Sequence, residues 1–368
     1  MNSRIISDIV IIDNLENKNS IRYLRGKENV KCDERLRKIL DNTKTSNIYS
    51  ISHVKDLDGV ASSSILMNAY NVKKEHVFFI EYSANHIESL YKEFSIFDLK
   101  ESVVVVTDIS MNDYLVDGFK RFLGMIKKNG STIIWLDHHP WSKYSINELK
   151  NYFDYAIMGE NPAYCAAQLA AIEFNKNKSK VIMNIAKIAH IADFNLGKKD
   201  DGKTPSISLA INYFESNKKS TRTNLRKLAD LIAHGKFNSD LMIRASNAYT
   251  RRFNQNIKSI LNGLVKFKVG TFSVCVGFGK SFNSTQVCDN ISKNVDSDLI
   301  VYAKYDSTSV TLRRTTPKIN CSIIANAFDG GGHAFAAGFP MISGIDIKKA
   351  TDREKFVLQL KQKLMQVM

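Results

Sequence analysis

Short, almost entirely apolar runs alternate with helical segments between residues 47 and 137. The runs NIYSISHV, HVFFIEY, SVVVVTD and STIIWLD have the length of strands, and segments with helical spacing, such as 59–71 and 112–128, lie between them. Strands that are apolar on both faces and alternate with helices are typical of a parallel sheet covered on both sides. The sequence therefore predicts an α/β fold built on a buried parallel sheet.

Polar and acidic residues follow each of these apolar runs. In open α/β sheets, ligands bind beyond the carboxyl ends of the strands, and those ends share one edge of the sheet. We therefore expect these side chains to gather at that edge: His53, Asp56, Asp58, Asp108, Asp137, His138, His139 and, from the later segment HIADFN, Asp193.

The pattern changes twice further along the chain of 368 residues. Residues 46–215 form the predicted sheet domain, and 216–263 read as a helical linker. After 263, a hairpin turning at Gly270, a second strand pair and a C-terminal helix predict a smaller α/β domain over 264–368. Residues 1–45 match neither domain, and their role stays open.

The acidic residues have a structural and a chemical interpretation. Taken singly, an aspartate at a strand end is most often a helix cap or a turn residue. Several carboxylates crowded at one edge, however, would repel one another unless cations neutralised them. Asp and His ligands without a thiolate suit Mn²⁺ or Mg²⁺, and the imidazoles favour Mn²⁺. Two such ions sharing a carboxylate are the usual clamp for in-line attack on phosphorus.

A glycine-rich segment, DGGGHAF, lies in the predicted second domain. Gly330, Gly331 and Gly332 would let backbone N–H groups approach an anion, and His333 could donate to a phosphate. A flexible turn is the structural alternative. Arg313, in VTLRR, ends a predicted strand of the same domain and offers a two-pronged phosphate ligand. Arg314 should face the opposite side of that strand.

These segments together resemble a known family. SHVKDLDG, VVVVTD, LDHHP and IADFN occur in the order of the four metal motifs of the DHH phosphoesterase family, and DGGGHAFAAGF resembles its DHHA1 substrate-binding domain. The resemblance covers residues 47–368. It implies an N-terminal parallel-sheet DHH domain that carries the metals and a smaller C-terminal DHHA1 domain that holds the substrate, joined by the helical linker.

The resemblance also implies roles for individual residues. His53, Asp56 and Asp108 would hold one divalent ion, while Asp58, Asp108, His138 and Asp193 would hold the other, with Asp108 bridging. Asp137 would orient an imidazole or a water, and His139 would face the scissile phosphate. Arg313 and the segment Gly330, Gly331, Gly332, His333 would bind the substrate. Mn²⁺ is favoured, with Mg²⁺ and Co²⁺ as alternatives.

The expected activity is hydrolysis of short oligoribonucleotides, linear dinucleotides or cyclic (oligo)nucleotides by a metal-activated water. A single-strand DNA 5′-exonuclease resembling RecJ, a pyrophosphate or polyphosphate hydrolase, and an inactive nucleotide sensor are the alternatives. A short nucleic acid or small nucleotide is the expected partner, without a membrane, and the choice between monomer and homodimer stays open.

Charge and cysteine content bear on the binding partners and the cellular compartment of the protein. The net charge of +15 favours polyanionic partners, although basic residues spread over solvated faces would produce the same excess. Five widely spaced cysteines without a CxxC pair fit free thiols in a reducing compartment, so we expect a cytoplasmic protein. Phe278, Phe335 and Phe339 are expected in the core rather than as stacking residues for bases.

Overall fold

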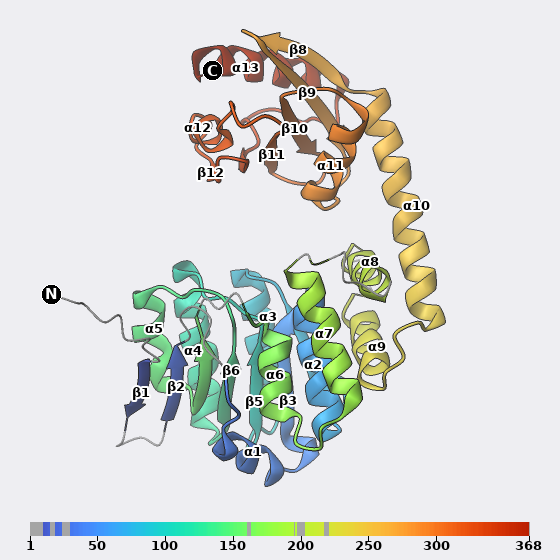
Figure 1. Ribbon diagram of the computed structural model, residues 1–368. Helices are drawn as coiled ribbons and strands as arrows, with labels where there is room; N and C mark the ends of the chain where they lie inside the picture. Colours follow the sequence, from blue (N-terminus) through green and yellow to red (C-terminus); the bar gives the residue numbers. More distant parts are fainter. Residues whose placement is uncertain are drawn as a thin grey trace, which may run out of the picture. The chain divides into compact units, whose positions relative to one another are not determined.

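The computed structural model describes residues 10–14, 19–23, 30–159, 163–194, 196, 203–216 and 221–367 (Figure 1). The chain divides into two compact units, Met1–Tyr249 and Thr250–Met368. Helix α10, Asp240–Asn262, runs across the boundary. Among the described residues, no helix is both long enough and apolar enough to cross a membrane.

The first unit is built on a seven-stranded sheet with the order β1-β2-β7-β6-β5-β3-β4. The six strands from β2 to β4 in this order run parallel to one another, and β1 is antiparallel to β2. The predicted parallel sheet is therefore confirmed. Its strands are β1 Val10–Asn14, β2 Asn19–Tyr23, β3 Ile48–His53, β4 Val77–Ile80, β5 Val103–Thr107, β6 Thr132–Leu136 and β7 Tyr155–Met158.

Helices cover both faces of this sheet, and the strand β5 shows why its sequence is continuously apolar. Val103 and Val105 join one buried cluster, whereas Val104 and Val106 join the other. The first cluster contains helices α1 Glu34–Asp41, α2 Leu57–Tyr70, α6 Ala166–Phe174, α7 Lys180–Asp193, α8 Lys203–Glu215 and α9 Thr221–Ala233. The second contains α3 Ala84–Phe94, α4 Val116–Lys128 and α5 Lys143–Leu149. Short 3₁₀ turns lie at Thr45–Asn47, Lys74–His76, Asp113–Leu115 and Lys150–Tyr152.

The N-terminal segment, whose role the sequence left open, belongs to the first unit. Strand β2 pairs with β7 in parallel and so extends the sheet at that edge. A polar network then ties α1 to α6. The Asp33 carboxylate pairs with Arg22 at 2.9 Å, and the Asp33 N–H donates to buried Glu173 at 2.9 Å. Tyr155 donates to the other Glu173 oxygen at 2.9 Å. This network fixes Arg22 and Asp33 against the sheet and α6.

The second unit has a six-stranded sheet with the order β12-β13-β11-β10-β9-β8. Its hairpin turns at Gly270, which has a φ of 56°, and only β9 and β10 pair in parallel. The strands are β8 Val265–Val269, β9 Phe272–Gly279, β10 Leu299–Lys304, β11 Ser309–Arg314, β12 Gly331–Gly332 and β13 Ala336–Pro340. The helices are α11 Ser284–Asn294, α12 Cys321–Asn326 and α13 Ala350–Val367.

One expectation about the core of the second unit is wrong. Phe278 and Phe339 are buried as predicted, at 5% and 2% exposure, but Phe335 is 51% exposed. The strand register explains the difference. Phe339 pairs with buried Val310 inside the sheet, whereas Phe335 precedes β13 in the loop from β12.

Candidate metal centre

The predicted site residues come from the carboxyl ends of three neighbouring strands and from one helix end. His53 ends β3, Asp108 follows β5, and the triplet Asp137, His138 and His139 follows β6. Strands β6, β5 and β3 are adjacent in the sheet. Asp56 and Asp58 lie at the start of α2, and Asp193 is the last residue of α7. The structure thus brings together all the residues that the sequence predicted for this edge.

The first group of possible ligands comprises His53, Asp56 and Asp108, whose ligand atoms lie within 4.8 Å of one another. His53 Nδ1 is 2.9 Å from Asp56 Oδ2 and 3.8 Å from Asp108 Oδ2. Asp56 also caps α2 by accepting from Gly59 N–H at 3.2 Å. A Cβ at Gly59 would lie 2.3 Å from the His53 carbonyl oxygen, so only glycine lets the helix approach the strand this closely.

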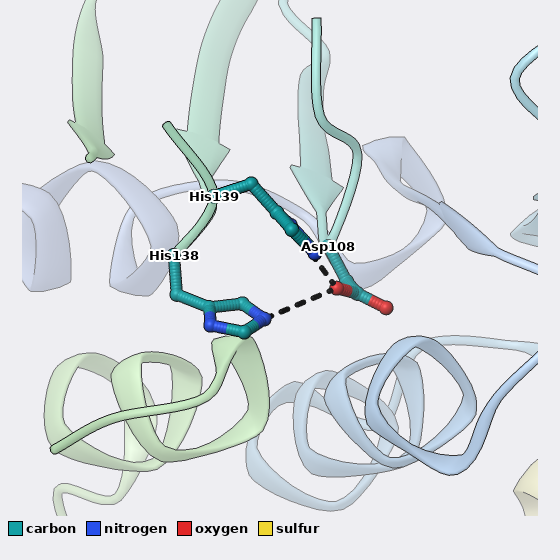
Figure 2. Close-up of side chains that lie close together, drawn as sticks. All are labelled: Asp108, His138 and His139. Carbon is teal, nitrogen blue, oxygen red and sulfur yellow. Dashed lines mark ion pairs between the residues drawn. The ribbon is translucent and has the colours of Figure 1, made fainter. Parts of the chain in front are cut away.

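The second group comprises Asp58, His138 and Asp193, again with ligand atoms within 4.8 Å. His138 Nε2 is 3.7 Å from Asp58 Oδ2 and 3.6 Å from Asp193 Oδ2. The same nitrogen is 3.8 Å from Asp108 Oδ1. Figure 2 shows His138 and His139 both directed at this Asp108 oxygen. Asp108 therefore belongs to both neighbourhoods, with one oxygen toward each.

A contact that the sequence did not reveal holds Asp58 in place. Its two carboxylate oxygens accept from the N–H groups of Ala166 at 2.7 Å and Ala167 at 2.8 Å. These are the first residues of α6, where the helix dipole favours a negative charge. Burial and then the charge of Asp193 nevertheless raise the pKa of Asp58 to about 7. The metal-free site thus carries more negative charge than its surroundings neutralise.

Asp137 is fully buried and binds two neighbours from its own segment. Its Oδ1 lies 2.8 Å from His139 Nδ1, and its Oδ2 accepts from Trp141 Nε1 at 2.8 Å. Burial alone would lower the pKa of His139, but the hydrogen bond and charge of Asp137 raise it to about 9. The imidazole that Asp137 contacts, and could orient as predicted, is therefore that of His139. Trp141 is not among the residues predicted from the sequence, although HHPW places it close to the motif.

The pKa shifts of Asp108 and His138 indicate a site that would bind a cation. Burial, and then the charges of Asp56 and Asp58, raise the pKa of Asp108 well above its usual range. Burial and the neighbouring His139 lower the pKa of His138, which keeps its ring neutral and able to ligate. Asp108 also has a φ of 56°, a conformation rare outside glycine that often marks a functional site.

Buried polar atoms without partners provide the most direct test of a metal site. In the part of the chain that the structure describes, His53 Nε2, His138 Nε2 and Asp108 Oδ2 are buried without a hydrogen-bond partner. Buried polar atoms are normally paired, and an unpaired one calls for an ion or a water. Oxygen and imidazole donors in overlapping groups suit hard or borderline divalent ions. The residues present therefore fit a pair of divalent cations.

Tyr82, which follows β4, is a second neighbour that the sequence analysis missed. Its ring stacks on His53 with centroids 4.3 Å apart and planes at 16°. Its hydroxyl donates to the Asp108 carbonyl oxygen at 3.2 Å. Tyr82 thus holds two residues of the first ligand group at once.

The predicted substrate residues lie in the second unit, and their loop has a defined geometry. A Cβ at Gly330 would lie 2.2 Å from the Gly338 carbonyl oxygen, and Gly332 has a φ of 137°. Gly331 differs, since a Cβ there would meet no atom within 4 Å. His333 is exposed after the glycines, and its N–H donates to the Ala336 carbonyl at 2.8 Å.

Arg313 is joined to this loop by the strand register. It pairs with Ala336 in the ladder between β11 and β13, and its guanidinium lies 3.7 Å from Asp289. Arg314 donates instead to the carbonyls of Pro317 and Ile319, which occupies it elsewhere. Arg313 is therefore the arginine of this pair that lies with the glycine loop.

No family model matches the sequence, and no curated protein matches it. Solved structures are similar. RecJ in complex with Mn²⁺ from Thermus thermophilus matches at 13% identity and a TM-score of 0.54, over 90% of this chain and 54% of that one. This chain thus spans about half the length of that RecJ. Exonuclease RecJ bound to manganese matches at 13% identity and a TM-score of 0.53, over 90% and 93% of the two chains.

A third similar structure is a DHH domain described as a member of the s1p family of ribosomal proteins. It matches at 15% identity and a TM-score of 0.53, over 89% of this chain and 88% of that one. The chain therefore has the fold of these DHH-domain and RecJ structures. The resemblance predicted from the four motifs is confirmed at the level of the fold.

Proposed function

We propose that the chain is a metal-dependent phosphodiesterase that hydrolyses short nucleotide substrates: short oligoribonucleotides, linear dinucleotides or cyclic (oligo)nucleotides. One observation carries the proposal. Asp108 places one carboxylate oxygen 3.8 Å from His53 and the other 3.8 Å from His138, and so joins two groups of ligands. A shared carboxylate between two such groups is the arrangement of two-metal phosphoryl-transfer sites.

The two groups define which residues would hold the ions. His53, Asp56 and Asp108 form one set, and Asp58, Asp108, His138 and Asp193 form the other. Bound divalent ions supply a water of lowered pKa as nucleophile and offset charge on the phosphoryl oxygens. The manganese in the two similar RecJ structures supports Mn²⁺ as the ion, with Mg²⁺ and Co²⁺ as alternatives.

The residues of the site that do not hold metal would orient side chains, hold a proton or bind the substrate. Trp141 fixes the Asp137 carboxylate, which holds a proton on His139 Nδ1. Against the effect of burial, the hydrogen bond and charge of Asp137 raise the pKa of His139 to about 9 in the metal-free site. A hydrogen bond donated by this ring would stabilise negative charge developing on a phosphoryl oxygen. In the second unit, Arg313, the glycine loop and His333 would bind a substrate phosphate.

Hydrolysis by the full chain with Mn²⁺ tests the proposal. The substrates are a linear dinucleotide, a labelled RNA of a few nucleotides and a cyclic dinucleotide, with pyrophosphate as the comparison. We expect turnover of at least one nucleotide substrate and a loss of about 100-fold or more in Asp193→Asn, because one metal set loses a ligand charge. Asp117→Asn removes an exposed carboxylate on α4 and should keep full activity. Failure to hydrolyse any nucleotide at saturating Mn²⁺ would overturn the proposal.

A RecJ-like 5′-exonuclease on single-stranded DNA is the second candidate. The net charge of +15 and the shared fold favour it. Long polyanions bind by counterion release, so such an enzyme should prefer long substrates and lose affinity steeply with salt. Comparing kcat/KM on short RNA and on long single-stranded DNA at two salt concentrations separates the two activities.

A further inference from the structure

The exposed ring of Phe335 is the feature of the second unit that the proposed chemistry does not use. It lies in the loop between β12 and β13, three residues after Gly332, and is 51% exposed. Its ring is nearly parallel to that of His333, with centroids 5.4 Å apart and planes at 4°. The Arg313 guanidinium carbon lies 5.8 Å from the centre of the Phe335 ring.

Packing does not account for this ring. The nearby aromatic residues Phe328 and Phe339 stack on each other at 4.4 Å; Phe339 belongs to the buried cluster of the unit, and Phe328 packs against it. Phe335 belongs to no such cluster among the described residues. Single exposed apolar side chains are common on protein surfaces. What sets this one apart is that a histidine ring and an arginine both lie beside it at a glycine loop.

The backbone around Phe335 is held in place. The Phe335 carbonyl accepts from Arg314 N–H at 3.2 Å, and the His333 N–H closes a short turn onto the Ala336 carbonyl at 2.8 Å. A ring on a fixed turn loses little further entropy when a ligand covers it. The loop therefore presents Phe335 rather than leaving it free to move into the core.

The ring lies in the loop that follows the outermost strand of the sheet. Strand β12 is the outermost strand of its sheet and pairs with β13 alone. Gly330 and Gly332 are required by close backbone contacts, but Gly331 faces open space. A glycine without a packing reason leaves its backbone accessible to an anion. A phosphate can therefore approach the Gly331 backbone, and the Arg313 guanidinium lies beside the Phe335 ring, which a flat group could cover.

We propose that Phe335 is the stacking surface for a nucleobase of the substrate, next to a phosphate site formed by Arg313 and the Gly331 backbone. The inference rests on the proposed function and names the residue that would recognise the base of the substrate. A phenyl ring offers nothing to pyrophosphate or polyphosphate, which have no flat apolar face. A phenyl ring can stack on any nucleobase, so this contact would depend little on the base sequence.

Binding of two ligands that differ only in the base tests the inference. Titration calorimetry on the full chain compares adenosine 5′-monophosphate with ribose 5-phosphate. Loss of a base stack by alanine substitution corresponds to about 5- to 150-fold in affinity. We expect wild-type protein to prefer the nucleotide by such a factor, and Phe335→Ala to remove the preference without changing ribose 5-phosphate binding. Phe335→Trp should retain it, and Leu358→Ala, an exposed apolar residue on α13, should match wild type.

The outcomes separate this inference from the proposed function. Equal affinity for the two ligands in wild type, or an unchanged preference in Phe335→Ala, overturns the base-stacking site even if dinucleotides are hydrolysed. A Phe335-dependent preference in a protein that hydrolyses no nucleotide supports the site and overturns the proposed activity instead. Circular dichroism of each variant confirms that the fold is intact before binding is compared.

Discussion

Replacing Asp108 with asparagine should raise the stability of the metal-free protein and lower its hydrolytic activity. The substitution keeps the size of the side chain and removes one charge. Asparagine also tolerates the left-handed backbone, which has a φ of 56° at this position. No hydrogen bond of Asp108 Oδ2 is lost, because that atom has no such partner among the described residues. The metal-free variant should therefore be more stable than wild type.

The size of this effect follows from the neighbouring carboxylates. The ligand atoms of Asp56 and Asp108 lie within 4.8 Å of each other. Two unit charges at this separation repel by about 3.5 kcal/mol at an effective dielectric constant of ~20. Asp56 is half exposed, so water screens part of this repulsion. We expect metal-free Asp108→Asn to gain about 2–3 kcal/mol in free energy of unfolding at pH 8.

The pH dependence has a definite sign. The folded-state pKa of Asp108 is raised. Near pH 4 and below, the carboxyl is protonated in both the folded and the unfolded state and does not lower the free energy of unfolding. Wild-type stability falls as pH rises toward and through that folded pKa. Asparagine does not titrate. The advantage of the variant should therefore be smaller at pH 5.5 than at pH 8.

Tryptophan fluorescence offers a direct assay. The only two tryptophans of the chain, Trp135 and Trp141, both lie in the first unit, so urea unfolding followed by their emission reports that unit. Proteins dialysed against chelator are compared at both pH values, then with Mn²⁺. Wild type should gain stability with the metal and the variant little. Hydrolysis by the variant should fall by about 10³-fold or more, for a loss of ~4 kcal/mol in the transition state.

One result would refute this reasoning. If metal-free Asp108→Asn is less stable than wild type by the same amount at both pH values, the carboxylate is a satisfied structural residue. The repulsion argument and the bridging role would then both be wrong.

Four further predictions concern neighbouring features. Mn²⁺ at 100 times its pH 8 Kd should stabilise the first unit by about 2.7 kcal/mol at pH 8. The same concentration should stabilise it less at pH 6, because protons compete for the ligands. An unchanged fluorescence transition at both pH values contradicts a metal site. Gly332→Ala should destabilise the second unit by about 1–3 kcal/mol, since a Cβ would lie 2.6 Å from Ala337 Cα. Gly331→Ala should change the stability of the second unit by less than about 0.5 kcal/mol yet weaken nucleotide binding. Circular dichroism measures the stability of both glycine variants and calorimetry their nucleotide binding; equal losses of stability in the two variants would contradict the prediction. Tyr82→Phe keeps the ring on His53 but loses the hydroxyl, so Mn²⁺ affinity should drop by about 10-fold, and unchanged affinity by titration calorimetry would show that the hydroxyl is not needed.

The sequence alone predicts the parallel sheet and the residues at its carboxyl edge. The reason is local: side-chain burial on both faces produces continuous apolar strands, and the polar residue that ends each strand is visible in the same segment. His53, Asp108 and the triplet from Asp137 could be found in this way. The glycine loop and Arg313 could be found too, because their chemistry is carried by short segments.

Contacts between distant segments were decided by the tertiary structure. The pairing of β2 with β7, the support of Asp58 by the start of α6 and the stacking of Tyr82 on His53 each join segments that no local pattern connects. Phe335 shows the same limit. Its apolar side chain predicts burial, but whether a ring is covered depends on what packs beside it, and here the ring lies in the loop before β13 and is half exposed. Periodicity determines the face on which a side chain lies, whereas only the folded chain determines what that face meets.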